Sequence, residues 1–162
     1  MNRTHWYSFF SSMTVVVVLC STLLGASGCE DYSTPAGVLA TAGDAIRHGE
    51  LDTLRRCFYG EAADIYANRD YVTLHRSPEG FGSLRIGETQ KDDSAAGLMV
   101  GETGAYRHFW VTGLDNETDA LVLTADVWCR VTHHRISIKR RLVPHRYEGC
   151  RIGRITWADG HR

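Results

Sequence analysis

Proline is scarce in this sequence, at three residues of 162, and no residue type dominates the composition. The formal net charge of −1 leaves no general excess of basic residues. These values exclude collagen-like, proline-rich and broadly disordered chains, and they argue against a nucleic-acid partner. With 43% hydrophobic residues and a length typical of one domain, the sequence predicts a single folded unit.

Catalytic and cofactor-binding signatures are also missing. The sequence holds no G-x-S-x-G, H-E-x-x-H, P-loop or Gly-rich dinucleotide-binding pattern. His133 and His134 are adjacent, and adjacent strand residues point to opposite faces, so they favour a turn over a metal site. The sequence therefore predicts no catalytic residue, no metal and no cofactor, and it favours a binding protein over an enzyme.

An apolar run follows a short N-terminal segment that holds one arginine. The run from Thr14 to Leu24 covers about a dozen residues if Met13 is counted, and a helix of that length rises only ~18 Å, short of the ~30 Å hydrocarbon core of a bilayer. Small residues follow at 25–28. This order is typical of a secretory signal peptide over residues 1–28, which cleavage would remove.

The end of this segment, Ala26-Ser27-Gly28-Cys29, resembles the lipobox of bacterial lipoproteins, although Ala26 stands where that family usually has leucine. The resemblance implies cleavage before Cys29, a lipid on Cys29 and a tether over residues 29–34. Ordinary signal cleavage at the same small residues is the alternative. Glu30 follows in place of aspartate, which by the same analogy favours the periplasmic side of an outer membrane.

Three further cysteines belong to the exported part of the chain: Cys57, Cys129 and Cys150. In an oxidising compartment, three cysteines predict one disulfide and one free thiol. Their spacing leaves the pairing open, and the absence of a close C-x-x-C pair argues against zinc.

Helical signals dominate the first half of the exported chain. Thr34 and Pro35 predict a helix start, apolar residues then recur at helical spacing, and Gly49 predicts the stop. A second helix is expected over 51–58, and a short third one over 61–67.

The later residues favour β-structure. The clearest segment alternates strictly from Leu121 to Val131, with Leu121, Leu123, Ala125, Val127, Cys129 and Val131 on the core face. A bulge is expected at Gly153. Other predicted strands are residues 71–74, 81–86, 107–112, 136–142 and 150–157, and a polar loop is predicted at 91–94.

This order predicts an α+β fold, in which N-terminal helices pack on a curved antiparallel sheet that ends in a three-stranded meander, all within residues 35–162. The helical opening at 35–58 and the closing strand at 151–157 resemble nuclear-transport-factor-two-like domains. That resemblance implies a cone-shaped fold with a concave pocket, and so a small-ligand carrier or enzyme as the alternative function.

Basic residues gather at the C-terminal end, where residues 130–162 hold nine Lys or Arg against two acids. Arg135, Lys139 and Arg141 are expected on one strand face, which predicts contact with an anionic partner such as lipid headgroups, glycan phosphates or an acidic protein. A solvated face that balances the acidic half is the alternative. Asp126, beside Trp128, is expected to pair with a neighbouring arginine rather than to act as a catalytic acid or base.

Together these features predict a cell-envelope lipoprotein that is anchored in the membrane by lipid and carries a small binding or assembly domain.

Overall fold

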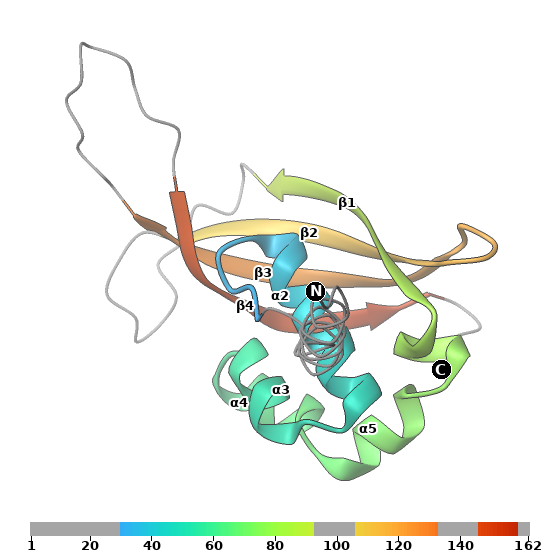
Figure 1. Ribbon diagram of the computed structural model, residues 1–162. Helices are drawn as coiled ribbons and strands as arrows, with labels where there is room; N and C mark the ends of the chain where they lie inside the picture. The colour runs from blue at the N-terminus through green and yellow to red at the C-terminus, as the bar shows by residue number, and fades with distance from the viewer. Residues whose placement is uncertain (1–29, 93–105, 133–145, 159–162) are drawn as a thin grey trace, which may run out of the picture.

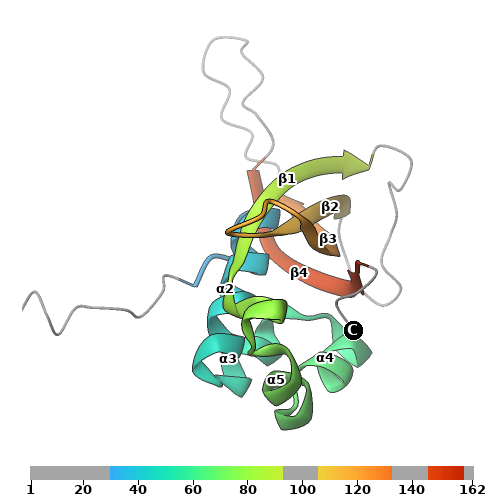
Figure 2. The ribbon, with the colours of Figure 1, turned by 90° about the vertical axis from the view of Figure 1, so that its right-hand side faces the viewer.

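The computed structural model describes residues 30–92, 106–132 and 146–158. In this part of the chain, helices fill the first half and an antiparallel sheet of four strands fills the second, in the order β1-β2-β3-β4 (Figure 1). The helices lie together on one side of the curved sheet (Figure 2). The expected α+β class is confirmed, with the helices packed on a four-stranded meander.

The first described helix, α2 (Pro35–His48), has the ends that its sequence predicts. The Thr34 hydroxyl accepts a hydrogen bond from the Gly37 amide at 2.9 Å, so it caps the start of the helix. Gly49 ends the helix in a left-handed conformation at φ 74°, which glycine adopts at little cost. Two short helices follow, α3 (Leu51–Cys57) and α4 (Gly60–Tyr66), close to their expected positions.

The next segment corrects two expectations. Residues 71–74, predicted as a strand, belong to helix α5 (Arg69–His75), because the Asn68 side chain accepts from the Tyr71 amide at 2.8 Å and caps a helix. Phe81, predicted to begin a strand, lies in the π-helical turn η1 (Pro78–Gly82), and the strand begins two residues after that turn. Local capping thus outweighs the β-propensity of a short apolar run.

The sheet consists of β1 (Leu84–Asp92), β2 (Tyr106–Asp115), β3 (Leu121–Thr132) and β4 (Arg146–Trp157). Lys91 and Asp92, expected in a loop, complete β1. β3 pairs directly with β4, although the sequence predicted a strand at 136–142 between them. That segment lies outside the described residues. The bulge at Gly153 is confirmed, because the register shifts between the pairs Asp126–Arg154 and Val127–Ile152.

The turn between β2 and β3 depends on one carboxylate. Asp115 accepts hydrogen bonds from the backbone amides of Thr118 and Glu117, at 2.8 and 3.0 Å. These bonds, that of Thr118 first, favour the charged form and lower the pKa of Asp115 to about 2. Residues 116–118 therefore form the turn that joins β2 to β3.

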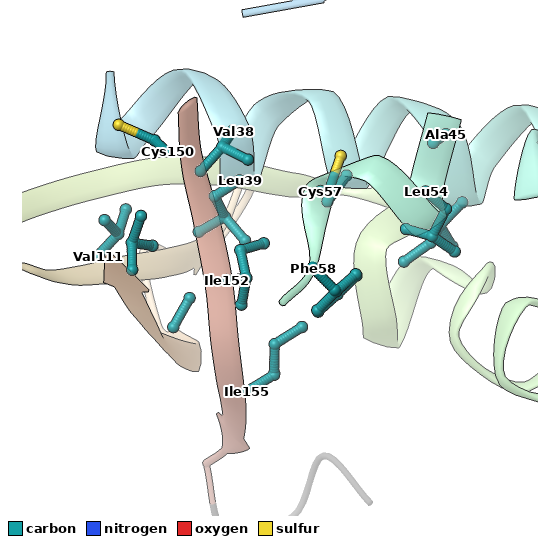
Figure 3. Close-up of a cluster of buried hydrophobic side chains, with 14 of the residues drawn as sticks. Val38, Leu39, Ala45, Leu54, Cys57, Phe58, Val111, Cys150, Ile152 and Ile155 are labelled. Atoms are coloured by element: carbon teal, nitrogen blue, oxygen red, sulfur yellow. The ribbon is translucent and has the colours of Figure 1, made fainter. Parts of the chain in front are cut away.

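The core lies between α2 and the sheet (Figure 3). α2 packs against all four strands, and Leu123, Ala125, Val127 and Cys129 of β3 are fully buried, as the alternation predicted. The two ends of the predicted face differ: Val131 is only half-buried, and Leu121 is 46% exposed, because it stands at the first position of β3, next to a shift of register. The buried side chains that fill this layer include Val38, Leu39, Ala42, Ile46, Leu54, Phe58, Val111, Ile152 and Ile155.

The outer edge of β4 is covered by two other segments of the chain. The Cys150 amide donates to the Tyr32 carbonyl at 2.7 Å, and the Tyr59 amide donates to the Ile152 carbonyl at 3.0 Å. Phe58 also forms an isolated parallel bridge with Ile152. These contacts use backbone groups that an open edge would expose to pairing with other chains.

Residues 30–34, expected as a tether, lie against the domain. Glu30 forms an ion pair with Arg56 at 2.8 Å, and the Asp31 amide donates to the Thr41 hydroxyl at 3.0 Å. With the bond to Cys150, the contacts hold this segment against α2, α3 and β4. None of the helices in the described ranges is both long and apolar enough to cross a bilayer.

The alternation of β3 can be tested by a matched pair of substitutions. Leu123→Asp places a charge without a partner among buried apolar side chains, and we expect it to lower the free energy of unfolding by about 3–5 kcal/mol. Thr124→Asp faces the other side of the sheet and is only half-buried, so its loss should stay below about 1 kcal/mol. Urea unfolding of both variants measures the difference, and equal losses would contradict the assignment of faces.

Candidate functional site

Four of the predicted site residues lie outside the described part of the chain. Cys29, the predicted lipidation site, precedes its first residue. Arg135, Lys139 and Arg141, the predicted anionic-partner face, fall between β3 and β4, as do His133 and His134. The functions assigned to these residues from the sequence stay predictions.

The structure resolves the pairing of cysteines that the spacing left open. Cys129 of β3 and Cys150 of β4 form a disulfide between adjacent strands, with both residues fully buried. The register shifts here, and Gly149 adopts φ 57° beside Cys150, a conformation that glycine provides without strain. Cys57 is a free, buried thiol.

Cys57 lies in the core and not in a reactive setting. Its sulfur donates to the Thr53 carbonyl at 3.3 Å. Burial raises the pKa of the Cys57 thiol to about 12, because an apolar environment disfavours the thiolate. Because the thiolate is the nucleophilic form, we expect Cys57 to be a poor nucleophile at neutral pH.

The face of the sheet that points away from the helices, called here the outer face, carries the polar side chains of the strands. Asp126 of β3 pairs with Arg154 of β4 at 3.2 Å, so the predicted ion pair with a neighbouring arginine is confirmed. The carboxylate is more enclosed than that prediction implied, since its side chain is only 13% exposed. Its Oδ1 atom is buried and has no hydrogen-bond partner among the described residues. Arg154 therefore balances a partly desolvated charge.

A histidine that the sequence analysis did not single out lies in the same region. The His108 ring stacks on Trp128 with centroids 4.6 Å apart and meets the edge of Trp110 at 4.7 Å. Its Nδ1 atom lies 3.1 Å from a carboxylate oxygen of Asp92. The two tryptophan rings thus orient the His108 ring beside the Asp92 carboxylate. The alternation of His108 with Trp110 was the available sequence signal.

Beyond this cluster the outer face is hollowed into a cleft of about 300 Å³, called here the β4 cleft. The Arg151 guanidinium lies over the Tyr59 ring, 5.6 Å from its centroid, and Tyr59 meets Tyr106 edge to face at 6.3 Å. Arg130 and Glu148 stand opposite one another on β3 and β4. The lining residues are Tyr59, Tyr106, Arg130, Glu148, Gly149 and Arg151.

The chemistry of the β4 cleft suits an anion. Guanidinium groups offer several N–H donors in one plane, a geometry that matches phosphate and carboxylate oxygens. Arg130 and Arg151 come from the basic region that the sequence identified, but neither was predicted as a site residue. Only the pairing of β3 with β4, and of Tyr59 with the edge of β4, brings them together.

Comparison with known proteins gives no relative, since no family model, curated protein or solved structure matches this chain. No group of three or more metal-binding side chains gathers within residues 30–92, 106–132 and 146–158. The candidate site therefore depends on its geometry alone.

The raised pKa of Cys57 predicts a slow reaction with alkylating reagents. At pH 8 we expect iodoacetamide to modify Cys57 at least ~100-fold more slowly in the folded protein than in urea, because burial both blocks access and suppresses the thiolate. Mass spectrometry of the peptide that contains Cys57 gives both rates. Similar rates in the two states would show that the thiol is accessible.

The disulfide is predicted to be a major source of stability. It joins residues 21 positions apart, and a closed loop of this size stabilises a fold by about 3 kcal/mol through the unfolded state. We expect Cys129→Ala combined with Cys150→Ala to lose about that amount in urea unfolding. Reduction of the wild-type protein should cause the same loss and leave the double variant unchanged. An unaltered midpoint in both cases would contradict this assignment.

Proposed function

We propose that the chain is a lipoprotein of the bacterial cell envelope, anchored through a lipid on Cys29, with a domain that binds an anionic partner on the periplasmic side of the outer membrane. The observation that carries this proposal is the buried disulfide between Cys129 and Cys150. Stable disulfides are typical of oxidising compartments outside the cytoplasm. An apolar run followed by a lipobox-like Cys29 accounts for how the chain would reach such a compartment.

The packing of the core supports binding over catalysis. The alternative from sequence, a carrier or enzyme, uses a concave pocket between helices and sheet. Here that layer is occupied by buried apolar side chains, among them Leu39, Ile46 and Ile152. Binding on the outside of the sheet agrees better with this packing.

Charge supports an anionic partner. The outer face holds Arg130 and Arg151 in the β4 cleft. The predicted face at Arg135, Lys139 and Arg141 falls between the same two strands in the sequence and adds to the basic charge of this part of the chain. Such a surface attracts anions at a distance, and salt weakens the attraction.

The anchor is tested by the mass of the N-terminus. We expect the mature protein from membranes to begin at Cys29 and to carry more than one acyl chain, because a single chain binds a bilayer only reversibly. In the Cys29→Ser variant the added lipid mass should be absent. Intact mass spectrometry of both proteins decides the matter, and an unmodified Cys29 in the mature wild-type protein would end the lipoprotein proposal.

A further inference from the structure

We propose that the β4 cleft binds the phosphate group of a phospholipid headgroup in the membrane that anchors the chain. This inference rests on the proposed lipid anchor and adds to it the ligand and the residues that recognise it. Three features of the described residues carry it: the charges in the cleft, its aromatic walls and its place beside the point where the N-terminal segment joins the domain.

The two arginines of the cleft have charges that the protein does not neutralise. Neither Arg130 nor Arg151 forms an ion pair within the described part of the chain, whereas Arg154 on the same face pairs with Asp126. Both are exposed, so they keep their hydration until a ligand arrives. Two guanidinium groups on adjacent strands can surround one phosphate from two sides, with hydrogen bonds that charge strengthens.

The tyrosines give the cleft a wall suited to an interface between water and lipid. Tyr106 is only 4% exposed and forms the floor, while Tyr59 stands under the Arg151 guanidinium. Rings with one polar end are favoured at the level of lipid headgroups. The contact between the Tyr59 ring and the Arg151 guanidinium also orients Arg151 in the cleft before binding, which lowers the entropy lost when a ligand is bound.

Glu148 determines how a bound headgroup would be oriented in the cleft. It lies opposite Arg130 and forms no ion pair with a described residue, although the two stand on neighbouring strands. Its carboxylate repels a phosphate and accepts hydrogen bonds from hydroxyl groups. A headgroup would therefore place its phosphate near the arginines and its glycerol hydroxyls near Glu148.

The docked N-terminal segment brings this cleft to the membrane. Tyr32 bonds to the backbone of Cys150, whose two neighbours, Gly149 and Arg151, both line the cleft. Cys29 precedes Tyr32 by three residues, and three residues span at most about 11 Å. A lipid on Cys29 would thus hold this end of β4 close to the headgroups, where the local concentration of phosphate is high.

Native mass spectrometry of the full chain can test both proposals in one measurement. The protein is released from uncharged detergent micelles doped with phosphatidylglycerol, so its own mass reports acylation at Cys29 and the additional mass reports bound lipid. We expect one bound phosphatidylglycerol. Arg130→Gln combined with Arg151→Gln should lower its affinity at least ~10-fold, and Glu148→Gln should raise it. All three side chains are exposed, so the melting temperature should stay unchanged.

A matched control removes the same charge elsewhere. Arg55→Gln combined with Arg85→Gln alters two exposed arginines that pair with Asp64 and Asp119, away from the cleft, and lipid binding should persist. Equal loss in this control, or no loss in the cleft variant, would overturn the site. If soluble glycerophosphate displaces the lipid and binds with the same affinity as phosphatidylglycerol, the ligand of the cleft is a free phosphate compound instead. Lipid binding by a chain without acylation would keep the cleft while rejecting the anchor.

Discussion

The packing of α2 across all four strands is the constraint on which the rest of the molecule depends. The helix buries the centre of one face of the sheet, with Val38, Leu39 and Ile46 wholly removed from water. Burial on this scale is the main source of stability in a domain of this size. The packing of α2 also limits where the sheet can bind other molecules. One face is covered by apolar side chains, so only the opposite face and the edges are available for recognition.

Strand β4 contributes both to the buried core and to the solvent-exposed face of the sheet. One of its faces supplies Ile152 and Ile155 to the core, its outer edge pairs with Tyr32 and Tyr59, and its other face supplies Arg151 and Arg154 to the solvent side. The disulfide ties it to β3 at the level of the β4 cleft. The cleft thus lies on a strand that is restrained on both edges, and a site held on such an element loses little freedom on binding.

The sequence predicted the elements whose signals are local. Thr34, Pro35 and Gly49 defined α2, and strict alternation defined the buried face of β3. α5 was missed because the cap at Asn68 gives a weaker signal than the aromatic and β-branched residues after it. The strand predicted at 136–142 stays a prediction, because these residues lie outside the described part of the chain. The β4 cleft could not be predicted, because Tyr59, Tyr106 and Arg151 meet only through strand pairing across the chain.

The contacts of residues 30–34 determine how far the domain can reach. A flexible linker lets a domain explore a volume that grows with linker length. Here Glu30, Asp31 and Tyr32 each form a bond to the rest of the domain, so these three residues add no length to a flexible linker. A domain on a short linker has a short reach, and its orientation relative to the point of attachment varies little. With the anchor proposed at Cys29, the domain would meet molecules that diffuse along the same membrane surface, and it would not reach across to a second one.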